Sequence, residues 1–364
     1  MLDPAKTRRG WYRNPDHPVR VNRHSGLVSP PCGGLVRRVS SLLTVLPALL
    51  AACSPPGPTA FDPPGEPQML FFDTYDGAGQ VVHPDVARFP GNGPLWMAVT
   101  PYPWAGEKYE NPSVYRSGDG IVWKEPAPGV NPIVGRPPYD HNCDPDLVVS
   151  GDELLLFFLE TQRREYRPDS LHFQDLRVVR SPDGIAWSDP ETVLRWDLDT
   201  DPLSLSPAIV RVGEKWRLYA VQPGRQRIIW LPSADLTHFG EPAGELTTGL
   251  PGIRPWHIDL FPIEGGWCAL LCARRTDAED PFDLHLWLGA SVDLNRWAFR
   301  PEPLLENGPE FLDTNAIYRS TGLVEGGRLA VWFSARTAAG RWFVGSASWD
   351  AALVTKLLTA SAAR

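Results

Sequence analysis

Three short motifs place acidic and imidazole side chains at similar points in successive sequence units. The motifs are His83-Pro84-Asp85, Asp144-Pro145-Asp146 and Trp256-His257-Ile258-Asp259. Two carboxyl groups across a pocket can hydrolyse a glycosidic bond, because one protonates the leaving oxygen while the other activates water or attacks the sugar. The residue types therefore suit hydrolysis of a carbohydrate.

We expect Asp85 to act as the base and Asp146 as the second carboxylate, with the proton donor left open among His257, Glu110 and Glu160. Aromatic rings could stack on sugars, and arginines could grip hydroxyls or the carboxylate of an acidic sugar. The expected substrate-binding residues are His83, Tyr102, Trp104, Asp144, Glu160, Trp256, Asp259, Arg274, Asn315 and Arg336. The alternative interpretation is structural: Asp85 and Asp146 would accept hydrogen bonds from backbone N–H groups, and His257 would be a satisfied structural histidine.

A second motif, serine followed two residues later by aspartate and then by an aromatic residue, recurs along the chain. It recurs at intervals of 52 to 64 residues, counting a degenerate last copy. The copies are Ser117–Trp123, Ser181–Trp187, Ser233–Phe239, Ser291–Trp297 and Ser346–Trp349. Aspartate beside glycine suits a tight turn, and we expect these motifs to be structural turns whose tryptophans pack between sheets.

Each motif is preceded by an apolar middle strand and, before that, by an inner strand. The expected middle strands are Leu95–Tyr102, Leu154–Thr161, Trp216–Pro223, Trp267–Arg274 and Leu329–Arg336. The inner strands begin near His83, Asp144, Ser206, His257 and Asn315. Five such repeats predict an all-β protein, a five-bladed β-propeller of four-stranded antiparallel blades.

The propeller is expected to span residues 69–350, with 69–73 closing the ring as the outer strand of the last blade. The tail 351–364 is either a last strand or a short helix. Inner strands start at one mouth of the central channel, where middle strands end and third strands begin. The candidate site residues are therefore expected at that mouth, where converging carboxylates raise some of one another's pKa values.

Composition excludes several classes of partner and cofactor. The 364 residues are 43% hydrophobic, and 39 prolines, 32 glycines and 15 tryptophans fit many short strands and turns. The net charge of −8 provides no basic face for nucleic acid. No Cys-x-x-Cys spacing is present, so we expect neither a metal site nor a cofactor, and we expect a monomer.

Residues 36–53 resemble a bacterial lipoprotein signal peptide. Arg37 and Arg38 precede an apolar run, and Leu50-Ala-Ala-Cys53 matches a lipobox, whose cysteine carries the lipid. We therefore expect a lipoprotein anchored to the bacterial cell envelope outside the cytoplasm, with 54–68 as a proline- and glycine-rich tether. Residues 1–35 are expected to be disordered or to lie before the true start of translation. The alternative to a lipoprotein signal is an ordinary cleaved signal peptide.

The remaining cysteines, Cys143, Cys268 and Cys272, are expected to be small buried apolar residues. Cys268 and Cys272 lie four apart on one strand, so their Cα atoms are about 13 Å apart, which is beyond disulfide reach. A disulfide from Cys143 to one of them is the alternative.

The repeats, with the motifs at Asp85 and Asp146, resemble the five-bladed propeller glycoside hydrolases of the arabinanase and xylosidase, invertase and levanase, and anhydrogalactosidase types. This resemblance implies that Asp85 is the base or nucleophile and that Asp146, or else Asp144, tunes or orients it. Arabinanase-like and invertase-like members open blade three with a general-acid glutamate, where this chain has Ser206. The anhydrogalactosidase type implies a histidine acid, for which His257 is the candidate.

Two functions follow from these residues. One is an exported, lipid-anchored glycoside hydrolase acting on a glycan or oligosaccharide. The other is a propeller that binds glycans without cleaving them, because it lacks the acid in blade three.

Overall fold

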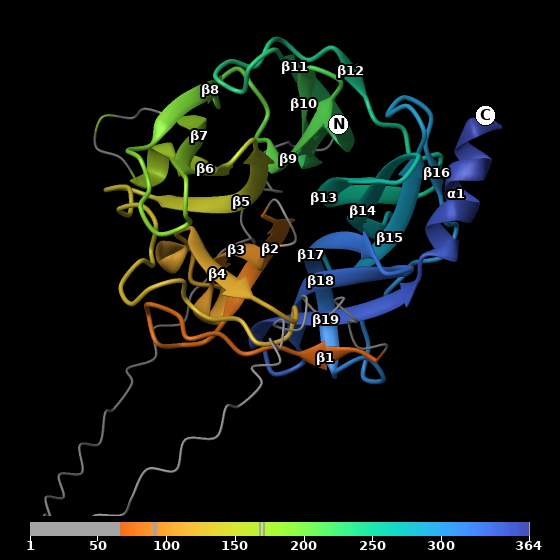
Figure 1. The fold of residues 1–364 in the computed structure, drawn as a ribbon, viewed down its shortest axis with the longest axis horizontal. Coiled ribbons are helices and arrows are strands. Elements are labelled where there is room, and N and C mark those ends of the chain that lie inside the picture. The colour runs from red at the N-terminus through yellow and green to blue at the C-terminus, as the bar shows by residue number, and fades with distance from the viewer. Residues whose placement is uncertain (1–65, 90–92, 167–168, 170–171, 364) are drawn as a thin grey trace, which may run out of the picture. The chain divides into compact units, whose positions relative to one another are not determined.

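The computed structural model describes residues 66–89, 93–166, 169 and 172–363. Its five antiparallel sheets are arranged as the blades of a propeller around a central axis (Figure 1). The predicted all-β, five-bladed architecture is confirmed.

The strands of each blade run from the axis outward. Blade one contains β2 (Val81–Arg88), β3 (Leu95–Pro101) and β4 (Ser113–Ser117). Blade two contains β5 (His141–Ser150), β6 (Glu153–Gln162), β7 (Phe173–Ser181) and β8 (Glu191–Asp197). Blade three contains β9 (Leu205–Val212), β10 (Lys215–Gln222), β11 (Arg227–Ser233) and β12 (Gly244–Glu245). Blade four contains β13 (Ile253–Ile263), β14 (Gly266–Arg275), β15 (Leu284–Ser291) and β16 (Ala298–Phe299). Blade five contains β17 (Thr314–Glu325), β18 (Arg328–Thr337), β19 (Trp342–Asp350) and β1 (Gln68–Met69).

Short 3-10 turns and one helix complete the described elements. The turns are η2 (Pro103–Ala105), η3 (Glu107–Tyr109), η4 (Arg164–Tyr166) and η5 (Pro223–Arg225). Blade one has three named strands, and a single antiparallel bridge between Arg116 and Lys124 takes the place of its fourth.

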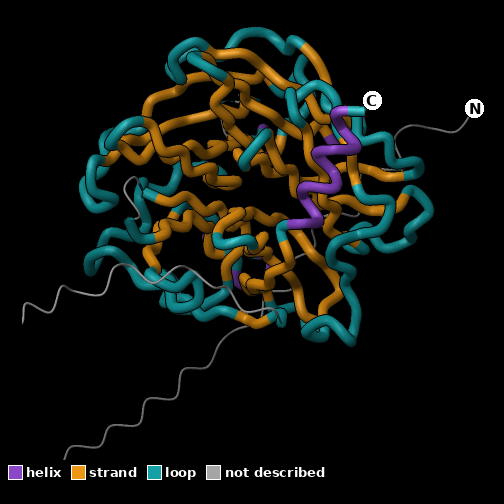
Figure 2. Tube along the Cα trace, turned by 45° about the vertical axis from the view of Figure 1, so that its right-hand side comes forward, coloured by secondary structure: helices purple, strands orange, loops and turns teal. Residues whose placement is uncertain are grey.

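The ring closes as the sequence predicted. Gln68 pairs with Ser346 and Met69 with Gly345, so the N-terminal strand β1 is the outer strand of the last blade. The C-terminal tail, which the sequence left undecided, forms helix α1 (Ala352–Ala362), which packs on β15 and β16 of blade four (Figure 2).

Four of the five Ser-x-Asp motifs are turns at the ends of the third strands. Ser181 Oγ accepts a hydrogen bond from Gly184 N at 2.8 Å, and Asp183 Oδ1 accepts from Ile185 N at 2.8 Å. The Trp123 ring meets Trp332 of blade five edge-on at 6.1 Å, so a tryptophan of these turns packs between blades. The structural interpretation is confirmed for these four, whereas the turn expected at the degenerate copy Ser346–Trp349 is wrong, because that segment lies within β19.

Cys143, Cys268 and Cys272 are buried free thiols, as expected. The lipobox cysteine, Cys53, lies outside the described residues, as do residues 1–35 and most of the tether. Among the described residues, no helix has the length and apolar character needed to cross a bilayer.

Gly184 tests the packing between the first two blades. Its φ is +71°, and a Cβ atom placed on it would lie 2.1 Å from the Trp96 ring. We expect Gly184→Ala to lower the free energy of unfolding by about 2–4 kcal/mol, because left-handed strain adds to overpacking. Urea denaturation measures this loss. Gly151→Ala is the matched control, since Gly151 has a φ of +61° and open space around it, and its cost should be only about 1 kcal/mol. Equal losses for the two variants would contradict the contact with Trp96.

Candidate functional site

In all five blades, the pairing between the inner and the middle strand shifts register near the start of the inner strand. Side chains at and just after this shift face the channel and form two layers, which we call tiers. We call the residues nearer the strand starts the upper tier: His83, Asp144, Ser206, His257 and Arg319. Two residues further along the same strands lies the lower tier: Asp85, Asp146, Asp259 and Thr321.

Three members of the upper tier have strained backbones. His83, Asp144 and Ser206 have φ values of 56°, 50° and 58°. Residues other than glycine rarely adopt this left-handed conformation, and such strain concentrates at functional sites.

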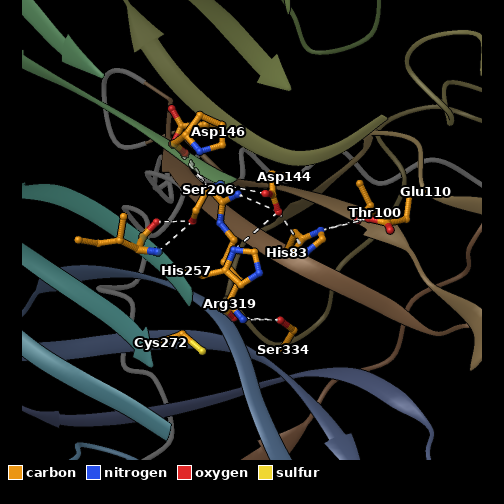
Figure 3. A network of polar contacts seen from close by, with 12 residues as sticks. His83, Thr100, Glu110, Asp144, Asp146, Ser206, His257, Cys272, Arg319 and Ser334 are labelled. Atoms are coloured by element: carbon orange, nitrogen blue, oxygen red, sulfur yellow. Dashed lines mark hydrogen bonds and ion pairs between the residues drawn. The ribbon is translucent and has the colours of Figure 1, made fainter. Parts of the chain in front are cut away.

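The upper tier joins residues from all five blades (Figure 3). Asp144 Oδ1 lies 3.1 Å from His83 Nε2 and 3.8 Å from His257 Nδ1. The other oxygen of Asp144 accepts a hydrogen bond from Ser206 N at 2.8 Å. His83, Asp144 and His257 are each at least 96% buried. Even so, Asp144 Oδ1, His83 Nε2 and both nitrogens of His257 have no hydrogen-bond partner. Buried polar atoms without partners are rare, and these atoms are free to bind a water molecule or an ion.

The far side of the His83 ring is held by two neighbours. Its Nδ1 lies 3.0 Å from Thr100 Oγ1 and 3.4 Å from Glu110 Oε2, while Thr100 Oγ1 donates to Glu110 at 3.4 Å. A proton on Nδ1 leaves the Nε2 lone pair facing Asp144 and His257. This is the arrangement of a metal-binding histidine whose second nitrogen is oriented by a carboxylate.

Burial sets the charge states of the upper tier. It lowers the pKa of His83 to about 4 and the pKa of His257 well below its usual value, so both rings are neutral at neutral pH. Burial also acts to raise the pKa of Asp144, but His83, His257 and Arg319 outweigh it and lower that pKa to about 2. Two neutral imidazoles and one carboxylate form a set of donors for a divalent cation.

His83, Asp144 and His257 form one of four described groups whose potential ligand atoms lie within 4.8 Å of one another. The separations of 3.1 and 3.8 Å from Asp144 Oδ1 lie on either side of the roughly 3.4 Å expected between ligands about 2.1 Å from one tetrahedral ion. Closely spaced ligands along the sequence, such as Cys-x-x-Cys, could not reveal this group, because its three members come from three different blades.

Glu110 extends the site toward blade two. Burial raises the pKa of its carboxyl group well above the usual value, with Glu107 and Asp144 adding to the effect. His141 lies on its other side, and Glu110, His141 and Cys143 form a second of the four groups. A raised pKa favours the protonated form of this buried carboxyl group.

The lower tier contains the two aspartates expected to be catalytic. One oxygen each of Asp85, Asp146 and Asp259 lies within 4.8 Å of the others. Asp85 accepts a hydrogen bond from Leu147 N of the next blade, and Asp146 accepts one from Ile209 N at 3.2 Å. These contacts match the alternative interpretation, in which the aspartates bond backbone N–H groups and link blades.

A hollow of about 320 Å³ adjoins the lower tier, and its other lining residues lie further along the inner strands. It therefore opens toward the mouth opposite the strand starts. Burial raises the pKa values of all three aspartates, that of Asp259 to about 7.

Arg319 connects the tiers. Its side chain is fully buried, and its Nη1 and Nη2 lie 3.8 Å from Asp144 and 3.9 Å from Asp146. Nη2 also donates to Pro207 O at 3.0 Å. Sequence analysis missed Arg319 because it started the last inner strand at Asn315, before the register shift.

Other predicted residues lie around the mouth. Trp104 is 64% exposed, whereas Tyr102 is buried against Trp342, with ring centroids 5.6 Å apart. Asn315 accepts a hydrogen bond from Arg336 at 2.8 Å. Glu160 is not brought to the upper tier, because it pairs with Arg177 of the neighbouring strand.

Sequence analysis also missed Tyr318, whose ring lies 4.5 Å from His257 and 5.3 Å from His83. A tyrosine within an apolar strand reads as core packing, so only the fold reveals that it borders the upper tier.

Comparison with solved structures supports the resemblance drawn from the sequence. A crystal structure of a thermostable family-43 glycoside hydrolase covers 73% of this chain and 88% of its own, with a TM-score of 0.52 at 12% identity. This chain has the propeller fold of those enzymes.

The crystal structure of an N-acetylgalactosamine deacetylase from F. plautii, in complex with blood group B trisaccharide, matches with a TM-score of 0.67 at 23% identity. It covers 82% of this chain and 98% of its own. This propeller is thus similar in fold to one that binds a carbohydrate.

A curated relative is the A type blood N-acetyl-alpha-D-galactosamine deacetylase of Flavonifractor plautii. It is 28% identical over an alignment of 321 residues that covers 73% of this chain. The chain spans only 41% of that relative's length. No family model matches the chain.

Arg319 is predicted to hold the channel together electrostatically. We expect Arg319→Met to lower the free energy of unfolding by about 3–5 kcal/mol, because it leaves the Asp144 carboxylate buried without its cation. Adding Asp144→Asn should recover part of this loss, since Asn can still accept the hydrogen bond from Ser206 N. A double-mutant cycle by urea denaturation measures the coupling, and strictly additive losses would contradict it.

Proposed function

We propose that this protein removes the acetyl group from an N-acetylated sugar of a glycan, with a divalent cation held by His83, Asp144 and His257. One observation carries the proposal. Buried ligand atoms of two imidazoles and a carboxylate converge without hydrogen-bond partners. The sequence similarity to a deacetylase supports the choice of reaction.

The chain's own residues fit hydrolysis of an amide. A cation at this site would act as a Lewis acid toward the acetyl carbonyl group. Thr100 and Glu110 orient His83 from behind, and Ser206 N and Arg319 hold Asp144 in its ionised form. Hydrolysis would add water to the acetyl carbon and break its C–N bond, so that acetate leaves while the amine stays on the sugar and takes up a proton. Glu110, whose pKa burial raises, lies behind His83 and orients that ring.

Glycoside hydrolysis is the second candidate, favoured by the raised pKa of Asp146, which suits a general acid. The geometry argues against inversion and is nearer the roughly 5–5.5 Å of retaining enzymes, because carboxyl oxygens of Asp85 and Asp146 lie within 4.8 Å of each other. An inverting glycosidase needs roughly 6.5–9.5 Å between its carboxyl groups to admit water.

The deciding experiment measures release of acetate and of reducing sugar from one panel of N-acetylated glycosides and oligosaccharides. We expect acetate from the native protein, a metal bound to it, and loss of both on dialysis against a chelator. His257→Ala should retain less metal and lower kcat/KM by roughly 100-fold or more, because a ligand is removed.

His238→Ala is the matched control, since His238 is exposed in a surface turn and should leave metal content and rate unchanged. Full activity without metal would refute the proposal. Release of reducing sugar without acetate would favour the glycosidase, and binding without either product would favour the glycan-binding propeller.

We also propose that the propeller acts outside the cytoplasm, tethered by lipid on Cys53, with a monomeric propeller as the working unit. The support is the sequence alone: two arginines, a short apolar run and the lipobox Leu50-Ala-Ala-Cys53. In a bacterial host, the full chain should incorporate labelled fatty acid and partition with membranes, whereas Cys53→Ala should do neither. Equal labelling of both chains would contradict the anchor.

A further inference from the structure

Two arginines face each other in blade four without a counter-charge. Arg254 on β13 and Arg274 on β14 are direct cross-strand partners. Like charges placed directly opposite each other destabilise a sheet. No ion pair is found for either guanidinium among the described residues, and Arg254 Nε has no hydrogen-bond acceptor. Binding of an anion between the two guanidinium groups would therefore stabilise this sheet.

The two side chains border a small hollow of about 60 Å³. It is lined by Pro223, Gln226, Arg254, Pro255, Trp256 and Arg274, and none of these described residues is acidic. The hollow therefore has room for a small anionic group such as a carboxylate or a sulfate ester.

The hollow lies beside the upper tier. Arg254 is three residues before His257, and Arg274 is at the end of the middle strand, so both are at the mouth where the inner strands start. The Trp256 ring stands between the hollow and His257, with the two ring centroids 6.1 Å apart. A glycan at the upper tier would pass Trp256 to reach the arginines.

We propose that Arg254 and Arg274 form a subsite for an anionic substituent, a carboxylate or a sulfate ester, on the sugar next to the one bound at the upper tier. This deepens the proposed function, on which it rests for the identity of the ligand as a glycan. Guanidinium groups bind carboxylate and sulfate oxygens through paired N–H donors, and Trp256 supplies a ring face on which the neighbouring sugar can stack.

The test compares charged and neutral probes by calorimetric titration of the full chain. One probe is a tetrasaccharide of alternating N-acetylhexosamine and hexuronic acid, paired with its carboxyl-reduced form. The other is a 6-O-sulfated N-acetyllactosamine, paired with its unsulfated form. We expect one charged probe to bind at least about tenfold more tightly than its neutral form, and Arg254→Met or Arg274→Met to abolish this preference.

Arg275→Met is the matched control, because Arg275 is the next residue, is exposed and pairs with Ile253 rather than with an arginine. It removes the same charge and should keep the preference. The melting temperature without ligand should stay constant or rise in Arg254→Met, since a repulsion is removed, so lost binding would not reflect unfolding.

The pair of probes that shows the preference identifies the anion as carboxylate or sulfate. Equal affinity for charged and neutral forms in both pairs would overturn the subsite, as would an equal loss of preference in Arg275→Met. Binding that depends on Arg254 and Arg274 without any acetate release would keep the subsite and refute the deacetylase. If acetate is released and the Arg254 and Arg274 variants change neither its rate nor the binding of the probes, the deacetylase stands and the subsite is refuted.

Discussion

Buried charge at the propeller axis is the constraint on which the rest of the structure depends. Four aspartates approach the channel, and Arg319 is the one guanidinium found near them in the described chain. The excess of carboxyl groups over guanidinium groups affects the four aspartates differently. Asp144 keeps its charge through Arg319, two histidines and Ser206 N, while burial raises the pKa values of Asp85, Asp146 and Asp259, which favours retained protons.

This division gives the two tiers different chemistry although they come from the same strands. Oxygens of Asp85 and Asp146 are occupied by backbone N–H groups of the next blade, so the lower tier links blades. Asp144 Oδ1, His83 Nε2 and both ring nitrogens of His257 have no hydrogen-bond partner. Because a buried polar atom without a partner costs free energy, the upper tier is where a ligand would lower the free energy most.

Left-handed residues occur at both ends of the strands, but in different settings. At the inner-strand starts, His83 and Asp144 adopt this conformation where they face the axis. In the Ser-x-Asp turns, Leu236 and Leu294 adopt it within a hydrogen-bonded turn. The strain at the strand starts is therefore the part that turn chemistry does not explain.

The sequence by itself determined the repeat: five apolar middle strands, four turn motifs and the closing strand follow from periodicity and turn chemistry, which are local. It also placed His83, Asp144, His257 and Glu110 at one mouth, since strand direction follows from the order of the repeats. Only the tertiary structure separated Asp85 from His83 into different tiers and brought Arg319 between them, because a register shift of a residue or two is invisible to a pattern of alternating polarity. The placement of Arg254 opposite Arg274 likewise depends on the register between β13 and β14.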